Sequence, residues 1–149
     1  MVYKDGSKYV GSWKDDKRDG EGEMEWHNGT TYNGEFLEDV KHGRGIYKWP
    51  NQCVYDGDWD MGKRTGQGKI TYPDGSEYNG KFKNNLKEGT GIFTFKDGSS
   101  YTGNWKNDLK DGRGAFKWAD GSKFHGNFEK GESKEGILTM KDGTQRNIN

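Results

Sequence analysis

The chain has 149 residues and a formal net charge of zero, with 28% hydrophobic and 14% aromatic residues. Balanced charge excludes a general attraction to nucleic acid or to an acidic membrane surface. Leu, Ile, Val and Phe make up only about 13% of the chain, a level typical of disorder, but the zero net charge and the many aromatic residues argue against disorder. With 25 glycines, the composition indicates β structure with many turns.

The first eight residues look like the closing half of a repeated unit. Tyr3 and Asp5 occupy the places that Tyr72 and Asp74 occupy further along the chain. We therefore expect residues 1–8 to be the end of a partial preceding repeat.

The next two segments alternate between two residue classes, as strands with one selected face do. Tyr9, Gly11 and Trp13 alternate with polar residues, and the alternation returns from Gly20 to Trp26. Between them, the six polar residues Lys14 to Asp19 are expected to reverse the chain. The unit is therefore predicted to be a β-hairpin.

The expected register places large side chains opposite glycines or other apolar residues, in the pairs Trp13 with Gly22, Gly11 with Met24, and Tyr9 with Trp26. A turn ending at Gly29 then places Phe36 of the next unit against Gly20. Each Gly-x-Gly would thus serve two aromatic residues, one from its own unit and one from the next. By the same reasoning, Gly68 is expected to lie under Trp59.

This pattern recurs every 23 residues over nearly the whole chain, and 23 of the 25 glycines fall on it, leaving out Gly62 and Gly131. Gln52 replaces a turn glycine, which predicts a different turn there. The last unit keeps only Gly136 of its Gly-x-Gly, as a terminal cap would. The predicted organisation is residues 1–8, six repeats at 9–31, 32–54, 55–77, 78–100, 101–123 and 124–145, and a tail at 146–149.

Stacked hairpins of this kind predict an all-β fold, an elongated single-layer antiparallel β-meander with the strong twist of a rod. A single layer has no second layer to cover its aromatic face. That face must coil on itself, fill with its own rings, or meet a partner.

The consensus Tyr-x-Gly-x-Trp, Gly-x-Gly and Asp-Gly resembles the MORN (membrane occupation and recognition nexus) repeat from Tyr9 to about Gly143. The resemblance implies binding or spacing and no particular reaction, since MORN arrays occur in membrane-tethering junctophilins, ciliary radial-spoke heads and cortical cytoskeletal scaffolds. They also lie beside catalytic domains in plant phosphoinositide kinases and some methyltransferases. Some were proposed to bind phospholipid, and others bind peptides in a groove or form dimers.

Residues that could carry catalysis or bind a metal are few. His27, His42 and His125 occupy different positions of the repeat and cannot form a repeated ligand set, and Cys53 has no histidine near it in sequence. The Gly-x-Gly pairs lack the helix and the Gly-Lys-Ser/Thr ending that phosphate binding needs. The sequence therefore predicts no enzyme, no catalytic residue, no metal and no cofactor.

The expected location is the cytoplasm, in association with the cytoskeleton or a membrane. Cys53 is the single cysteine, so an intramolecular disulfide is impossible and a reducing compartment fits best. No stretch approaches the roughly 18 apolar residues that span a bilayer, and the N-terminus lacks the features of a signal peptide.

Two sets of side chains are candidate binding surfaces. The first is an aromatic groove for a partner, with its rings half exposed, made of Trp13, Phe36, Trp59, Phe82, Trp105 and Phe128. The second is a basic strip along the hairpin-loop edge, for phosphoinositide head groups or an acidic partner, made of Arg18, Lys41, Arg64, Lys87 and Lys110. The alternative for the basic set is solubility and edge protection, because Asp19, Glu88 and Asp111 cancel much of its field.

These observations predict a non-enzymatic scaffold or protein interaction module, part of a cytoskeletal or ciliary assembly, that binds a partner segment or a second copy of itself. A phosphoinositide-binding, membrane-tethering module is one alternative. An accessory segment of a larger multidomain enzyme is the other. Neither nucleic acid nor a small-molecule substrate is expected as a ligand.

Overall fold

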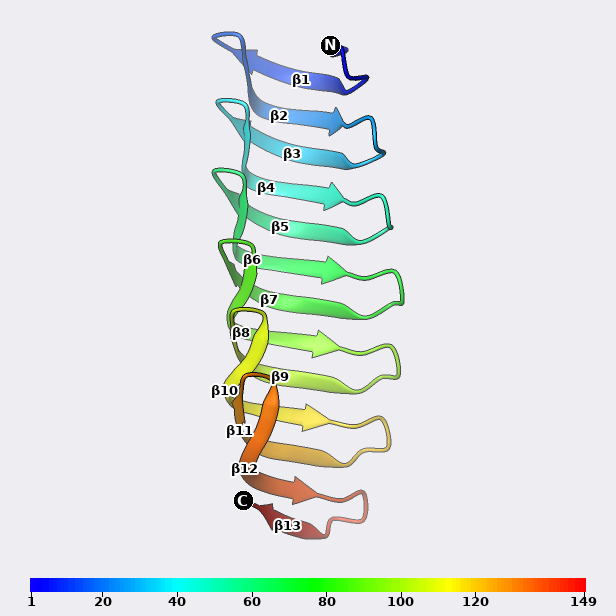
Figure 1. The fold of residues 1–149 in the computed structure, drawn as a ribbon, viewed down its shortest axis with the longest axis vertical. Coiled ribbons are helices and arrows are strands. Elements are labelled where there is room, and N and C mark those ends of the chain that lie inside the picture. Colours follow the sequence, from blue (N-terminus) through cyan, green and yellow to red (C-terminus); the bar gives the residue numbers. More distant parts are fainter. The chain divides into compact units, whose positions relative to one another are not determined.

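The computed structural model describes all residues, 1–149, as an open antiparallel β-meander of 13 strands in which strand order follows chain order (Figure 1). The prediction of an all-β, single-layer meander of hairpins is confirmed. The chain divides into two parts, Met1–Pro73 with Lys83–Asn85, and Asp74–Phe82 with Leu86–Asn149.

The strands alternate between a shorter and a longer one in every hairpin. The first six are β1 (Lys8–Lys14), β2 (Lys17–Glu25), β3 (Thr31–Leu37), β4 (Val40–Lys48), β5 (Val54–Asp60) and β6 (Lys63–Thr71). The others are β7 (Glu77–Lys83), β8 (Leu86–Thr94), β9 (Ser100–Lys106), β10 (Leu109–Lys117), β11 (Lys123–Glu129), β12 (Glu132–Thr139) and β13 (Gln145–Ile148). Most of the segment expected to be a tail thus forms β13, which pairs with β12.

The turn within each hairpin is much tighter than expected. Strand β1 ends at Lys14 and β2 begins at Lys17, so the six-residue reversal predicted over Lys14–Asp19 is wrong. Asp15 and Asp16 make the turn with φ values of 51° and 63°. A two-residue turn with both central φ values positive matches the twist of the two strands, and Asp and Asn tolerate it better than most residues.

The turn between hairpins is closed by an Asn or Asp side chain. In the first repeat, the Asn28 carboxamide oxygen accepts a hydrogen bond from the Thr30 backbone N–H at 2.9 Å. The turn at Gln52 has the same pattern: the Cys53 N–H donates to the Asn51 side chain at 2.9 Å, and the Gln52 N–H donates to the Trp49 carbonyl at 3.1 Å. The expectation of a different turn is therefore wrong. Gln52 adopts the same left-handed conformation, with a φ of 77°.

The register within a hairpin is shifted from the expected one. Gly11 pairs with Gly22 and Tyr9 with Met24, whereas Trp13 pairs with Arg18. The two-residue turn sets the pairs next to it, and a β-bulge then leaves one residue of β1 opposite three residues of β2 before Gly11 pairs with Gly22.

The bulge contains Gly20, whose φ of 86° is strained for any residue with a side chain. Between hairpins the expected register is confirmed, since Gly20 pairs with Phe36.

The buried tyrosines explain the glycines of the repeat. The Tyr55 ring lies over Gly68, where an added Cβ would stand 2.5 Å from the ring carbon Cε2. The Tyr55 hydroxyl donates to the Asp58 carbonyl at 2.7 Å, and Asp58 is the residue of β5 that faces the bulge of β6. Gly68 therefore lies under Tyr55, and the expected position under Trp59 is wrong. The same hydroxyl-to-carbonyl bond recurs at Tyr9, Tyr32, Tyr78 and Tyr101, at 2.7–2.9 Å.

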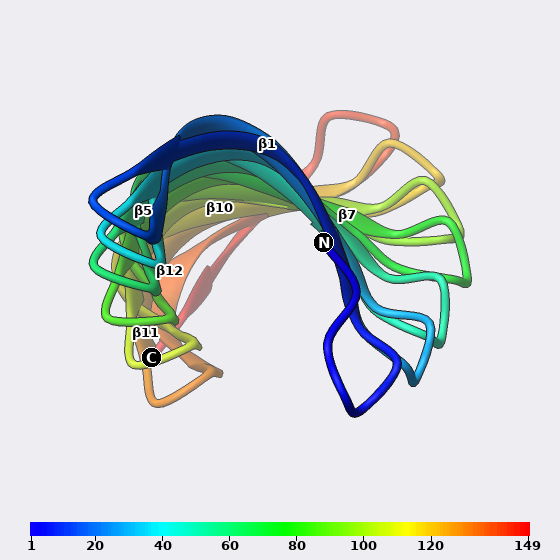
Figure 2. The ribbon, with the colours of Figure 1, turned by 90° about the horizontal axis from the view of Figure 1, so that it is seen from above.

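The hairpins are bent, so that each part has a concave and a convex face (Figure 2). At the centre of each hairpin two glycines face each other so closely that a Cβ on Gly34 would stand 2.4 Å from the Gly45 Cα. Tyr32, Tyr55 and Tyr101 are completely buried. In a single layer this burial requires the sheet to curve around the rings, so the aromatic side chains occupy the concave face.

Candidate functional site

The aromatic residues of the shorter strands form the floor of the concave face. Phe36, Trp59, Phe82, Trp105 and Phe128 are buried, and only Trp13 is exposed, at 44% of its surface. The expectation that a single layer leaves these six rings half exposed is therefore wrong for five of them. Each shorter strand is covered by its own hairpin's bend and by rings of its neighbours, which the sequence pattern alone does not show.

The floor rings are held by contacts with other rings and by hydrogen bonds from indole N–H groups to glycine backbone carbonyls. Trp59 packs edge-to-face on Tyr32 with ring centroids 5.6 Å apart, and its indole N–H donates to the Gly45 carbonyl at 3.1 Å. In the second part, the Trp105 indole donates to the Gly91 carbonyl at 3.2 Å. Since Gly45 also lies under Tyr32 of its own repeat, the expected sharing of each Gly-x-Gly between two repeats is confirmed.

The accessible rings belong to the longer strands and the turns that follow them. In the second part, Phe93, Phe95 and Phe116 are half-buried and Trp118 is 40% exposed. Their ring centroids lie 4.6 Å apart for Phe93 and Phe95, 5.7 Å for Phe95 and Phe116, and 4.8 Å for Phe116 and Trp118. In the first part, half-buried Trp26, Tyr47 and Trp49 make a similar row.

The basic residues lie next to the hairpin turns, as expected, but their side chains extend over the aromatic face. The Lys41 ammonium stands 5.2 Å from the Trp59 ring centroid and 5.3 Å from that of Tyr47. The same arrangement recurs for Arg18, Arg64, Lys87 and Lys110, at 5.4–5.9 Å from two or three rings each. The tight turn and the bulge cause this, because they place each basic residue directly opposite a floor ring.

Burial and ion pairing both act on these cations. Arg18 pairs with Asp39 at 3.2 Å and Lys87 pairs with Asp108 at 3.8 Å, and the side chains of Arg18 and Lys87 are only 20% and 14% exposed. The first cause that lowers the pKa of Asp39 is the hydrogen bond from the Arg18 backbone N–H. Desolvation lowers the pKa of the Lys41 and Lys110 amines.

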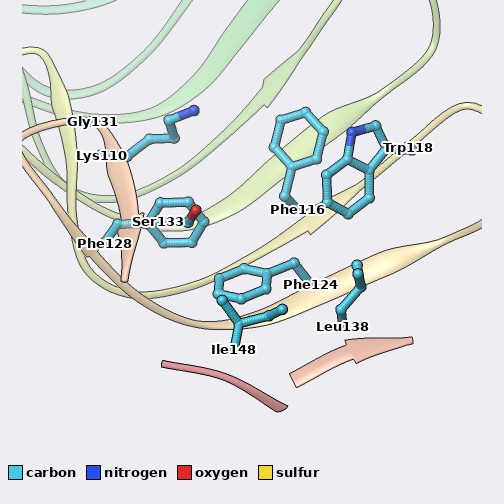
Figure 3. A pocket seen from close by; sticks show the side chains of 9 residues that line it. All are labelled: Lys110, Phe116, Trp118, Phe124, Phe128, Gly131, Ser133, Leu138 and Ile148. Atoms are coloured by element: carbon cyan, nitrogen blue, oxygen red, sulfur yellow. The ribbon is translucent and has the colours of Figure 1, made fainter. Parts of the chain in front are cut away.

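A hollow of about 370 Å³ lies on the concave face near the end of the second part (Figure 3). Rings surround it on two sides, and the Lys110 ammonium group points over it from a third (Figure 3). Its lining includes Lys110, Phe116, Trp118, Phe124, Phe128 and Ile148. Such a hollow offers apolar surface with one cation at its rim.

The remaining side chains that could bind a metal or act in catalysis do not form a cluster. No group of three or more His, Cys, Asp or Glu side chains could hold a metal ion. His42 accepts a hydrogen bond from the Met61 backbone N–H at 3.1 Å, and burial raises the pKa of the Cys53 thiol. No helical segment of the structure has the length and hydropathy of a membrane span.

The family model of the MORN repeat matches five consecutive stretches, residues 9–31, 32–54, 55–77, 78–100 and 101–123. The chain belongs to the MORN repeat family. These MORN repeats begin at the buried tyrosine and end after the inter-hairpin turn, so each match contains one hairpin. No curated protein matches the chain.

Among solved structures, the MORN sheet is similar to the TCP domain of SAS-4 (dCPAP) of Drosophila melanogaster, in complex with a proline-rich motif of Ana2 (dSTIL). The TM-score is 0.63 at 15% identity, covering 99% of this chain and 81% of that one. A mutant of the TCP10 domain of Danio rerio CPAP gives 0.47 at 13% identity, covering 99% and 69%. At this identity the first likeness shows a shared fold.

The accessible rings of the MORN sheet were not among the residues singled out from the sequence. The signal was present, because each longer strand carries two apolar residues spaced by two, such as Phe93 and Phe95. Both strands of a hairpin alternate in the same way, so alternation alone could not tell which of them keeps its rings accessible.

Proposed function

We propose that this chain is a non-catalytic scaffold module that binds an extended segment of a partner protein on its concave aromatic face. The observation that carries the proposal is the row of accessible rings on the second part, from Phe93 and Phe95 to Phe116 and Trp118. Accessible aromatic rows of this kind are enriched in binding surfaces, because large rings bury much apolar area with little loss of conformational freedom.

The floor rings of the shorter strands support the binding surface in this proposal. The five buried ones set the position of the accessible rings, as Trp105 does where its ring centroid lies 6.2 Å from that of Phe93. Trp13 is the member of the predicted groove that can itself touch a partner, since 44% of its surface is exposed.

The similar TCP domain supports a peptide as the partner, because its solved complex contains a proline-rich motif. Proline-rich segments favour a preformed extended helix that docks against aromatic grooves with a small entropy cost. An extended peptide lying across β8 and β10 would meet this kind of surface here.

The test is a displayed library of random and proline-rich peptides, selected on the protein, followed by dissociation constants for the selected peptides. Replacing Trp118 with alanine, and separately Phe95, should weaken binding by tenfold or more, about 1.4 kcal/mol. Ile92→Ala is the matched control, because Ile92 is an apolar residue with 45% of its surface exposed on the opposite face. Melting curves check that each variant folds.

The proposal would be wrong if Ile92→Ala weakened the selected peptides as much as Trp118→Ala did. It would also be wrong if the folded Trp118 and Phe95 variants bound with unchanged affinity. Either result would place the peptide away from the concave rings.

A further inference from the structure

Three of the five basic residues each form hydrogen bonds with a residue in the turn of the following hairpin. The Asp39 backbone N–H donates to the Arg18 carbonyl at 2.9 Å, and its carboxylate accepts from the Arg18 N–H at 2.8 Å. Lys87 and Asp108 make the same two bonds, at 3.1 and 2.7 Å. Asn85 supplies the equivalent side-chain oxygen to Arg64 at 2.9 Å. The turn residue therefore bonds to both the backbone N–H and the backbone carbonyl of the basic residue.

Lys41 and Lys110 lack this side-chain partner, because the turn position that follows each of them is a glycine. The backbone bond is kept, since the N–H groups of Gly62 and Gly131 donate to the carbonyls of Lys41 and Lys110 at 2.7 and 2.8 Å. These are the two glycines that fall outside the repeat pattern. Each ammonium group lies over aromatic rings, and neither makes an ion pair like that of Lys87 with Asp108.

Only Lys110 of these two borders the hollow in the second part. In the next hairpin Ser133 stands opposite Phe128, where the earlier repeats place a basic residue opposite the floor ring. No second long cation therefore fills the space, and both Gly131 and Ser133 line it. In Figure 3 the Lys110 ammonium group and the ring of Phe116 face the same open space.

We propose that this hollow binds the carboxylate of an Asp or Glu side chain in a partner peptide, with a neighbouring apolar side chain against Phe116, Trp118 and Phe124. This inference rests on the proposed function and names the chemistry of the partner. A poorly solvated cation without a counter-charge gains more from an anion than a solvated one does.

The charge of the hollow selects a carboxylate over a phosphate. Lys110 is the one cation in the lining, and the only other polar side-chain groups are the Ser133 hydroxyl and the Trp118 indole N–H. A phosphate group of charge near −2 with three acceptor oxygens would leave most of its charge and acceptors unmatched. A single carboxylate matches one ammonium group and one hydroxyl.

The experiment compares two pools of hexapeptides blocked at both ends, one with Glu and one with Gln at the third position, and with apolar residues elsewhere. Binding is followed through the NMR signal of the Trp118 indole. Since the pools differ only in the charged group, we expect the Glu pool to bind at least about tenfold more tightly. A pair of small probes, 3-phenylpropionate and 3-phenylpropionamide, should show the same preference.

Gly131→Asp should abolish the preference for Glu, because it supplies to Lys110 the carboxylate that Asp108 supplies to Lys87. The backbone accepts this change, since Gly131 has a φ of 89° and Asp108 a φ of 70° at the same turn position. Gly62→Asp is the matched control in the first part, where it should leave the preference intact. Lys110→Met, which keeps an apolar stem without the charge, should act as Gly131→Asp does.

Equal binding of the Glu and Gln pools at Trp118 would overturn the carboxylate inference and leave the proposed function standing. A Glu preference that survives in both Gly131→Asp and Lys110→Met would also overturn it. Binding of neither pool, in a protein whose selected peptides fail as well, would count against the proposed function itself. Displacement of the Glu pool from Trp118 by phosphoinositide vesicles, but not by phosphatidylcholine vesicles, would replace the carboxylate with a phosphate head group.

Discussion

At the scale of single residues, the glycine positions of the repeat are set by the space for a Cβ atom and by the backbone conformation. Gly68 has no room for a Cβ atom, because the Tyr55 ring lies on its Cα. Gly62 has open space around it but a φ of 87°, so its constraint comes from the backbone conformation. One residue type thus serves two different physical needs, close approach at Gly68 and left-handed backbone at Gly62.

Replacing Gly68 with alanine should lower the free energy of unfolding by about 2 kcal/mol or more, because the new methyl group overlaps the Tyr55 ring. Gly62→Asn should change it by less than about 0.5 kcal/mol, since Asn85 occupies the same turn position with a φ of 72°. Urea unfolding of the three proteins measures both effects. Equal losses for the two variants would contradict the position of Gly68 under the ring.

Gln52 occupies a turn position that holds glycine in every other repeat. Its φ of 77° carries a steric cost that glycine does not have. Gln52→Gly should therefore raise the free energy of unfolding by about 0.5–1 kcal/mol, after the greater chain entropy of glycine is subtracted. A lower melting temperature for this variant would show that the Gln52 side chain makes a stabilising contact.

At the scale of the hairpin, the buried tyrosine and the bulge are coupled by a hydrogen bond. The bulge shifts the register, which leaves a carbonyl of the shorter strand without a regular partner, and the tyrosine hydroxyl donates to that carbonyl. In the third hairpin the pair is Tyr55 and Asp58, at 2.7 Å. The ring covers the glycine pair at the bend, so one side chain stabilises both irregular features of the hairpin.

Burial of these tyrosines predicts alkaline unfolding. Desolvation raises the pKa of Tyr101 to about 12 and also raises the pKa of Tyr9, Tyr32 and Tyr55. Below about pH 10 the tyrosines are protonated in both the folded and the unfolded chain, so their contribution to stability is constant. Above about pH 10 the unfolded chain releases these protons while the folded chain keeps them, so stability falls until the folded pKa is passed.

Melting temperatures between about pH 8 and pH 11 check this prediction, with a loss of up to about 1.4 kcal/mol per pH unit for each buried tyrosine. Tyr55→Phe should be less stable at pH 8 by about 1 kcal/mol, the value of the lost hydrogen bond. Its stability should then fall less steeply with pH. A flat profile in the original protein would mean that the hydroxyl groups are reached by solvent.

At the scale of the whole chain, the distribution of charge bears on the binding functions that the sequence leaves open. The net charge is zero, and the basic residues that could attract a membrane lie over rings on the concave face. Arg18 and Lys87 are also paired with Asp39 and Asp108. Arg18 and Lys87 therefore offer little charge to a flat anionic surface, whereas the rings of Phe95 and Trp118 remain accessible.

We therefore expect vesicles that contain phosphatidylinositol bisphosphate to bind the protein no better than phosphatidylcholine vesicles do at about 0.15 M salt. Co-sedimentation measures this. Specific binding that is lost in the folded Lys87→Glu variant, with peptide binding by the Trp118 face unchanged, would favour the membrane-tethering function. Co-sedimentation at low salt alone would reflect weak, screened attraction and would agree with the expectation.

The repeat, the two strands of each hairpin, the positions of the turns between hairpins and the face of each aromatic residue could be predicted from the sequence, but the two-residue turn within the hairpin could not. The predictable features depend on local chemistry: a period of two residues, glycine or Asx at positions of positive φ, and a spacing of 23 residues. The register error did not disturb the faces. Gly22 pairs with Gly11 where Trp13 was expected, and a shift of two residues keeps every side chain on the same side of the sheet.

Which rings are accessible and where the cations lie could not be predicted from the sequence. The bulge at Gly20 and the two-residue turn bring Arg18 opposite Trp13, and no pattern in one repeat signals that displacement. The exposure of Trp118 and the burial of Trp105 depend on the curvature of the sheet and on rings from neighbouring repeats. Burial arises from contacts between repeats, and the residues of a single repeat specify only half of each contact.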